Sequence, residues 1–366
     1  MGLEVLGSAQ ISYSGIKNSS WVDSNEVYYA LEQVLESVEK QSGVRIRNVE
    51  VGIPGSFIKI ISKTAQVQVK GHVTERDVEF LTSKADKFDV AEDLTLVYEW
   101  PAWFFLDDGN VYLDPVGVPA RKMRGCISFT FANKYFLNDV IDLFKHLGIR
   151  VDNFIPEPLA EALYLIPQER RDSLAVLVDI GYYTTNVSLI YGDAILYFKT
   201  IPMGGGSITS DISYIMKLEE ETAEQLKRRY SFGLEENNNN SYMYAKDSEG
   251  KLKKYPYELI KEIIDARVEH LVLYITKLFI RAERNLNKKI DIFITGGGIS
   301  FMRGSGSFYR HVAGRSPLPI KVNSVKLQSP DMHAAYAMLQ FAYDGMFEIK
   351  PKSKKRGLGR GRDQRF

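Results

Sequence analysis

Residues 174–186 read Leu-Ala-Val-Leu-Val-Asp-Ile-Gly-Tyr-Tyr-Thr-Thr-Asn, and this segment is the main evidence for the class of fold. Its first seven residues form a nearly continuous apolar run, which is typical of a strand buried on both faces of a sheet. Apolar segments at 187–190 and 194–200 follow after tight turns and predict two more strands. Residues 290–295 predict another buried strand, which runs directly into three glycines. The pattern predicts an α/β fold.

Helices are predicted on both sides of these strands from apolar residues at helical spacing. The predicted ranges are 24–42, 133–147, 211–230, 257–286 and 330–343. Asp23 and Thr74 precede helical segments and are predicted N-caps. Residues 234–254 are polar and predict a surface loop, while 63–150 predict a compact α+β unit.

Composition limits the class of protein. The chain has 366 residues, of which 45% are hydrophobic, so it can form two domains with buried cores. Its single cysteine, Cys126, excludes a disulfide framework and a multi-cysteine zinc site, and this fits a reducing cytoplasm. The histidines show no metal-ligand spacing, and no apolar run reaches the ~18 residues of a membrane span.

Charge is unevenly distributed along the chain. Residues 351–366 carry seven Lys or Arg and one Asp, whereas the net charge of the whole chain is only +1. The rest is therefore mildly acidic, which argues against nucleic acid as the main partner. The basic end is interpreted as a solvated tail; the alternative is electrostatic attraction to anionic lipid, worth ~1 kcal/mol per basic residue.

The end of the strand in 174–186 carries the first candidate site. An acidic residue at a strand end, followed by a turn with glycine and hydroxyls, suits a phosphate–Mg²⁺ pair. Asp179 would orient metal-bound water, while the turn at Gly181 and the hydroxyls of Thr184 and Thr185 would face phosphate oxygens. An ordinary turn between strands is the alternative interpretation.

Three other segments could contribute to the same site. Gly296–Gly298 would let the backbone approach a ligand closely, or else form a plain flexible turn. Glu224 and Lys227 share one helix face, which suits a ribose hydroxyl and an adenine edge, or an ordinary surface ion pair. Pro158 can open a helix and would leave Glu157 facing a cleft, where a carboxylate can position water.

The order and spacing of these segments resemble the actin-like ATPases, and within them the FtsA family of bacterial cell division proteins. The resemblance extends through about residue 344. The stretches that carry it are Leu3-Glu-Val-Leu-Gly, Gly15-Ile-Lys, Val51-Gly-Ile-Pro-Gly-Ser-Phe-Ile, Pro115-Val-Gly-Val, Glu157-Pro-Leu-Ala, Val178-Asp-Ile-Gly, Ile201-Pro-Met-Gly-Gly-Gly-Ser-Ile-Thr-Ser-Asp-Ile and Thr295-Gly-Gly-Gly-Ile.

The resemblance implies an actin-like, ribonuclease H-like fold of two lobes with the inserted α+β subdomain of the FtsA type. The expected units are a first lobe at 1–62 plus 151–172, the inserted subdomain at 63–150, a second-lobe core at 173–210 plus 288–344, an outer subdomain at 211–287 and a basic tail at 345–366.

The resemblance also implies ATP and Mg²⁺ in the cleft. Glu157 would position water, and Asp179 would hold Mg²⁺ through water. The implied cofactor-binding residues are Asp179, Gly181, Thr184, Thr185, Gly204, Gly205, Glu224, Lys227, Gly296, Gly297 and Gly298.

The implied partners are other proteins. The family forms head-to-tail filaments of itself on the cytoplasmic face of the cell membrane at the division site, and it captures the FtsZ C-terminal peptide. In this chain the peptide would bind the subdomain at 211–287, where Arg267 and Glu269 resemble a family segment. Later division proteins would join through further contacts.

Three departures from the family change what is expected. Relatives begin with a strand carrying a first phosphate loop, whereas Met1-Gly2-Leu3 here matches the third strand, so we expect an incomplete or rearranged first lobe from a misassigned start or a truncated gene product. Tyr182 and Tyr183 replace two phosphate-approaching glycines, and Asn186 replaces a carboxylate. The C-terminal end has few apolar anchors, which predicts electrostatic membrane contact only.

These features predict an actin-like scaffold of the FtsA type with weak ATP binding and at most weak ATPase activity. Two alternatives stay open. One is a nucleotide-free paralogue that acts as a binding module, which the tyrosine pair favours. The other is a phosphotransferase of the same fold, which requires a catalytic Asp aimed at a substrate hydroxyl.

Overall fold

The computed structural model describes residues 4–13, 16–17, 20–21, 23–86, 89–233, 241–247, 249–287 and 289–345. The basic tail at 351–366 and the segment Asn237–Asn240 lie outside the described residues. Within the described ranges, no helix combines the length and apolar character that crossing a bilayer requires.

The central sheet of the second lobe contains the strand identified first in the sequence. Its order is β11-β10-β9-β14, with β14 parallel to β9 and the other pairs antiparallel. Thr295 at the end of β14 pairs with Asp179 of β9, so the turn after β9 and the glycines after β14 meet at one edge of the sheet. The strands are β9 (Ala175–Ile180), β10 (Thr185–Tyr191), β11 (Ala194–Ile201) and β14 (Asp291–Thr295).

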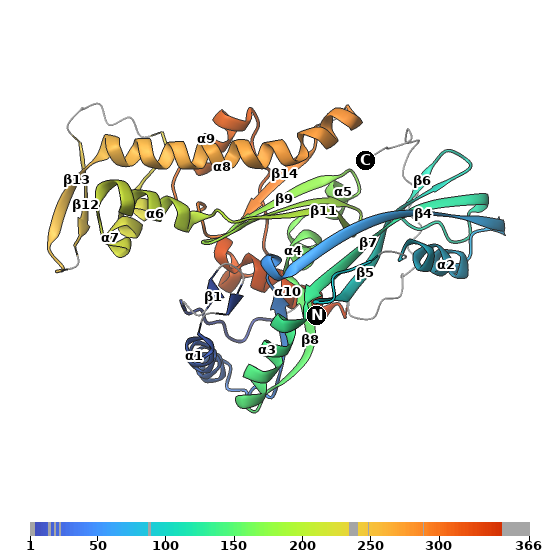
Figure 1. The fold of residues 1–366 in the computed structure, drawn as a ribbon, viewed down its shortest axis with the longest axis horizontal. Helices are drawn as coiled ribbons and strands as arrows, with labels where there is room; N and C mark the ends of the chain where they lie inside the picture. Colours follow the sequence, from blue (N-terminus) through green and yellow to red (C-terminus); the bar gives the residue numbers. More distant parts are fainter. Residues whose placement is uncertain are drawn as a thin grey trace.

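Helices cover both faces of this sheet (Figure 1). Val176, Val178 and Ile180 belong to the core that includes α6 to α8, whereas Ala175 and Leu177 belong to the core that includes α4 and α10. This alternation confirms that β9 is buried on both faces. The helices are α4 (Glu157–Leu165), α5 (Gln168–Arg171), α6 (Gly205–Met216), α7 (Glu220–Arg229), α8 (Tyr257–Leu286), α9 (Ser305–Ala313) and α10 (His333–Tyr343).

The first lobe is built around a parallel pair of strands. Among the described residues, its sheet consists of β3 (Asn48–Ile53) and β8 (Arg150–Pro156), and a short antiparallel pair precedes it. Asp23 caps α1 by accepting from the backbone of Glu26, as the sequence predicts, and Gly43 ends the helix at φ +69°. The remaining elements are β1 (Ile16–Lys17), β2 (Ser20–Trp21), α1 (Ser24–Ser42) and α3 (Lys134–His146).

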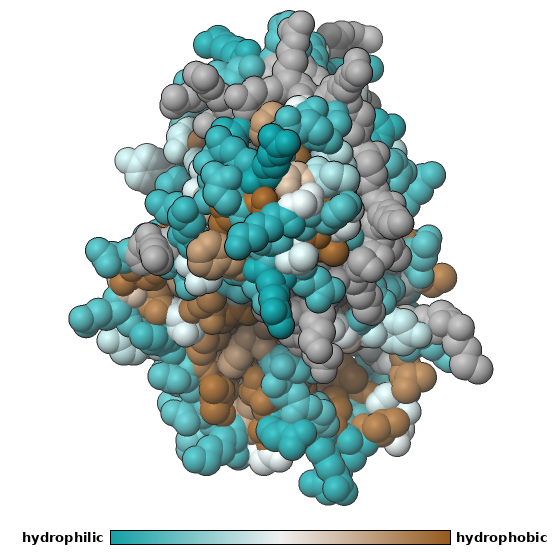
Figure 2. Space-filling view, turned by 90° about the vertical axis from the view of Figure 1, so that its right-hand side faces the viewer, coloured by the Kyte–Doolittle hydropathy of each residue, from teal (hydrophilic) through white to brown (hydrophobic). Residues whose placement is uncertain are grey.

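A four-stranded antiparallel sheet of order β4-β7-β5-β6 forms the segment predicted as a compact α+β unit. Thr74 and Asp77 form the capping box that starts the helix over this sheet. Ser62 and Ser128 donate hydrogen bonds to backbone carbonyls of β11, which attach the unit to the second lobe. Figure 2 views the molecule from the side on which this unit lies. Its elements are β4 (Ile58–His72), α2 (Glu75–Ala85), β5 (Leu94–Leu106), β6 (Val111–Tyr112) and β7 (Pro119–Asn133).

Two local predictions were wrong. The single helix predicted at 211–230 is two helices, because the chain turns at Lys217 with φ +53° between α6 and α7. Part of the predicted loop at 234–254 is a hairpin, since Ala245 and Tyr255 are buried in the second-lobe core. After β14, residues 297–301 form turns. The hairpin strands are β12 (Tyr242–Lys246) and β13 (Leu252–Pro256), and short 3₁₀ turns are η1 (Gly55–Phe57), η2 (Val325–Leu327) and η3 (Pro330–Met332).

Candidate nucleotide-binding site

The turn after β9 is bound by the two glycine segments. The backbone N–H of Gly181 donates to the carbonyl of Thr184 at 2.9 Å and closes the turn. The N–H of Gly205 donates to Gly181 at 2.9 Å, and the N–H of Gly298 donates to Ile180 at 2.7 Å. The sequence-predicted glycines therefore do come together, and three of their amides bind protein carbonyls.

Close backbone packing explains why glycine stands at these positions. A Cβ on Gly298 would lie 2.3 Å from the carbonyl oxygen of Gly181, and one on Gly205 would lie 2.5 Å from that of Gly298. Gly296 has φ +89°, and its Cβ would meet a carboxylate oxygen of Asp179 at 2.4 Å. Gly204 also abuts Gly181 and Tyr182. The glycines are thus required by contacts between loops of the chain itself.

We expect Gly298→Ala to destabilise the protein by about 1–3 kcal/mol, because backbone atoms on both sides must move to admit the methyl group. Gly306→Ala is the matched control: no atom lies within 4 Å of its Cβ position in α9. Alanine should stabilise that helix by about 0.5–1 kcal/mol. Urea unfolding of both variants measures the difference, and equal effects would contradict the assigned packing.

The hydroxyl of Thr185 and the amide of Asn186 have partners within the protein. Thr185 is fully buried and donates through Oγ1 to the carbonyl of Met203 at 2.7 Å. Asn186 accepts from Thr200 Oγ1 at 2.9 Å and donates to Asp179 Oδ2 at 3.4 Å. Thr200 also contacts the Gly55 carbonyl of the first lobe at 3.2 Å. Asn186 therefore helps to join the two lobes.

Three carboxyl groups lie together beside this turn. Glu157 begins α4 with Pro158 in the first turn, as the sequence predicts, and Glu161 follows one helical turn later with 2% of its surface exposed. Burial and the charge of Asp179 raise the pKa of Glu157 to about 8, and the same two causes raise that of Glu161. Burial also raises the pKa of Asp179 to about 6, against the opposing effect of Asn186.

Glu161 was not predicted as a site residue. Its i, i+4 spacing from Glu157 places both residues on the same face of a helix, and this could have indicated it. In the part of the chain that the structure describes, no Lys or Arg forms an ion pair with these three carboxyl groups. Nor do three or more Asp, Glu, His or Cys side chains there stand close enough to hold a metal ion jointly. Binding of Mg²⁺ by Asp179 through water stays a prediction.

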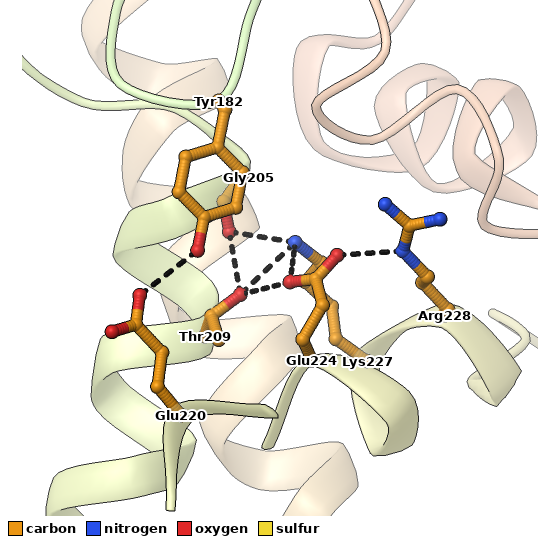
Figure 3. Close-up of polar contacts among 7 residues, drawn as sticks. All are labelled: Tyr182, Gly205, Thr209, Glu220, Glu224, Lys227 and Arg228. Atoms are coloured by element: carbon orange, nitrogen blue, oxygen red, sulfur yellow. Dashed lines mark hydrogen bonds and ion pairs between the residues drawn. The ribbon is translucent and has the colours of Figure 1, made fainter. Parts of the chain in front are cut away.

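Glu224 and Lys227 bind each other (Figure 3). Lys227 is 4% exposed; its Nζ lies 2.6 Å from Glu224 Oε2, 3.1 Å from the Gly205 carbonyl and 3.0 Å from Thr209 Oγ1. Arg228 also donates to Glu224, at 2.7 Å. Burial raises the pKa of Glu224, but the hydrogen bonds from Arg228, Lys227 and Thr209 outweigh it and hold the pKa low. The predicted nucleoside-binding pair is therefore an internal, hydrogen-bonded ion pair.

Tyr182 lies over this ion pair. Its hydroxyl donates to Glu220 Oε1 at 3.0 Å, and Lys227 Nζ is 5.2 Å from the centre of its ring. Burial, followed by the hydrogen bond to Glu220, raises the pKa of the Tyr182 phenol. Tyr183 meets the first ring edge-on at 5.0 Å. Figure 3 shows the Tyr182 ring on the side of α6 that faces Lys227.

The polar groups that would hold ATP are bound to other groups of the protein in this arrangement. The ammonium group of Lys227 has three donors, and three protein oxygens already surround it. Two amides at the start of α6, where an anion would bind, donate to the Gly181 and Tyr182 carbonyls.

The candidate partner residues on α8 have different environments. Arg267 binds both oxygens of Asp211, at 2.5 and 2.8 Å, and so attaches α8 to α6. Its burial is partial, and the pairing raises the pKa of its guanidinium. Glu269 is exposed on the same helix. A role for either in partner binding stays a prediction.

Comparison with known proteins identifies relatives of the whole chain. The family model described as "Cell division protein FtsA" matches residues 176–342. FtsA of Streptococcus pneumoniae is 24% identical over 349 residues, which cover 93% of this chain and 75% of the relative. FtsA of Bacillus subtilis is 22% identical, with 93% and 78% covered, and FtsA of Escherichia coli K12 is 20% identical, with 97% and 88% covered.

Two solved structures share the fold. The PilM-PilN type IV pilus biogenesis complex matches with a TM-score of 0.61 at 16% identity, covering 91% of this chain and 90% of that one. The ethanolamine utilization protein EutJ from Carboxydothermus hydrogenoformans matches with a TM-score of 0.52 at 13% identity, covering 90% and 78%. The actin-like fold expected from the sequence is thereby confirmed. The chain is thus similar to FtsA proteins of diverse bacteria over most of its length, and to the FtsA family model over residues 176–342.

Proposed function

We propose that this chain is a division scaffold that acts through protein contacts and binds ATP weakly or not at all. The observation that carries the proposal is the internal occupation of the candidate nucleotide site: Lys227 is paired with Glu224, and Tyr182 lies over it. A phosphotransferase must hold a triphosphate at this place. The arrangement therefore supports the scaffold and its nucleotide-free variant, a binding module, over an enzyme.

The proposed place of action is the cytoplasmic face of the cell membrane at the septum. There the chain would connect FtsZ in the Z ring to later division proteins and to other copies of itself in a head-to-tail filament. Its basic end at 351–366 would add electrostatic attraction to anionic lipid. If nucleotide binds, Asp179 would hold Mg²⁺ through water, and Glu157 would position a water molecule.

Exposed apolar surface supports a role in protein contacts. Contiguous exposed apolar patches on a soluble protein commonly mark protein–protein interfaces. On the outer subdomain, Leu273 and Tyr274 are exposed on α8 near Glu269. We place the FtsZ peptide on this face of α8.

The test is binding of a fluorescent FtsZ C-terminal peptide to the purified chain, with and without MgATP. We expect binding that changes less than about twofold with MgATP, since the site is internally occupied. Leu273→Glu should weaken it by about tenfold or more, because a charge enters an apolar contact; tenfold corresponds to about 1.4 kcal/mol.

Leu339→Glu is the matched control, because Leu339 on α10 has the same exposed fraction of 42% and lies outside the outer subdomain. It should leave peptide affinity unchanged. If the folded chain binds no peptide, or if both variants weaken binding equally, the placement of the peptide on α8 is wrong.

A further inference from the structure

We infer that Tyr182 is a built-in occupant of the nucleotide site, which joins the outer subdomain to the core of the second lobe in the way a bound nucleotide otherwise would. The inference rests on the proposed function and adds to it the residue that makes ATP unnecessary. Three independent features of the structure support it: the contacts of the Tyr182 side chain, the contacts of its backbone, and the charge balance around Lys227.

The side chain of Tyr182 reaches from the turn after β9 to the helices of the outer subdomain (Figure 3). Its hydroxyl donates to Glu220 Oε1 at 3.0 Å in the first turn of α7. Its ring lies 5.2 Å from Lys227 Nζ, within the range of a cation–π contact. An aromatic ring with a hydroxyl thus occupies the surroundings that the resemblance assigns to an adenine and its ribose.

The backbone of the same turn occupies the start of α6. The first amides of a helix have no partner within the helix, and they form an anion-binding site when left free. Here the N–H of Gly206 donates to the Tyr182 carbonyl at 2.7 Å, and the N–H of Gly205 donates to Gly181. A Cβ on Gly206 would lie 2.7 Å from Cε1 of the Tyr182 ring. The ring therefore packs directly on the helix backbone.

The charges of the site are balanced without a ligand. Lys227 and Arg228 both bind Glu224, and Glu220 accepts from Tyr182. Lys227 and Arg228 carry two positive charges, and Glu220 and Glu224 carry two negative charges. The cluster therefore offers no excess positive charge to a triphosphate. A ligand would have to displace the Tyr182 ring and also break the contacts of Lys227.

The test compares Tyr182→Gly with Tyr182→Phe and Tyr183→Gly in the full chain, using MgADP and MgATP as probes. Tyr182→Phe keeps the ring and loses only the hydroxyl, and Tyr183 is 56% exposed and serves as the control. We expect Tyr182→Gly to lower the Tm by several degrees and to bind MgADP at least tenfold more tightly than wild type in calorimetry. Wild type, Tyr182→Phe and Tyr183→Gly should show no shift in Tm with 1 mM of either probe.

A second measurement on wild type remains decisive if Tyr182→Gly does not fold. Hydrogen exchange at the amides of Gly205 and Gly206 should be slow without nucleotide and unchanged by MgADP. Fast exchange that MgADP slows, or wild-type binding as tight as that of Tyr182→Gly, would overturn the inference. Peptide binding separates the two proposals. If wild type binds both ATP and the FtsZ peptide, only the proposed role of Tyr182 is contradicted. If wild type binds neither ATP nor the peptide, only the scaffold function is contradicted.

Discussion

Replacing Arg171 by methionine should lower the free energy of unfolding by about 3–5 kcal/mol, since the change removes one partner of a buried, hydrogen-bonded ion pair. Arg171 is 7% exposed, and its guanidinium donates to the carbonyls of Leu163 and Ile166 at 2.6 and 2.7 Å, at the end of α4. It also donates to Gly192 at 3.2 Å and to Asp193 at 2.7 Å, in the turn between β10 and β11. Methionine fills much of the space and supplies no donor, so buried carbonyls lose their partners.

The neighbouring residue gives the control. Arg170 is more exposed and forms one ion pair, with Asp291 at 3.0 Å. Such pairs contribute about 0–1 kcal/mol, so Arg170→Met should have a small effect. Urea unfolding followed by both circular dichroism and tryptophan fluorescence measures the two variants. If Arg171→Met costs no more than Arg170→Met, then the guanidinium does not anchor α4 as described.

Glu161→Gln should make the protein more stable at pH 8 than wild type, by about 1–3 kcal/mol. Burial, then the charges of Asp179 and Glu157, raises the pKa of Glu161 in the folded chain. At a pH below the ordinary carboxyl pKa, Glu161 is protonated in both the folded and the unfolded chain. Burial of the neutral acid then carries no ionisation penalty. As the pH rises, the unfolded chain releases its proton first, so the wild type loses stability until the folded carboxyl ionises too.

The measurement is the difference in unfolding free energy between Glu161→Gln and wild type from pH 4 to pH 8. The difference should grow as the pH rises above the ordinary carboxyl range, near pH 4.5, because the raised pKa keeps Glu161 protonated in the folded chain after the unfolded chain has lost the proton. Glu169→Gln is the control, because Glu169 is exposed on α5, and its difference from wild type should stay flat. A Glu161→Gln difference that shrinks with rising pH would show that the carboxylate form is the one favoured by folding.

Local sequence predicted several elements because the physical cause is local. The apolar run before Asp179 and the one before Gly296 specify strands buried on both faces, and the structure contains both as parallel neighbours. Asp23 and Thr74 specify helix starts because their side chains bind amides two or three residues ahead. The break at Lys217 was missed, since an αL turn at a non-glycine residue has only a weak sequence signal.

The candidate site was only partly predictable. Motifs in the sequence indicated Asp179, Glu157 and the Tyr182–Tyr183 pair, and the structure brings these side chains to one edge of the sheet. It did not select Thr209, Glu220 or Arg228, which complete the cluster around Lys227. Single polar residues on helices are usually solvated, so nothing in their own sequence context distinguishes them.

The class of fold could be predicted from the sequence, because buried strands, caps and glycine turns depend on residues close in the chain and on their order. The contacts within the candidate site depend on the packing of distant segments. Tyr182 and Lys227 lie 45 positions apart, and their contact depends on how the turn after β9 packs on α6 and α7. A pattern of residues can show that glycines have been replaced by tyrosines; the three-dimensional packing decides whether those rings point into solvent or into the site.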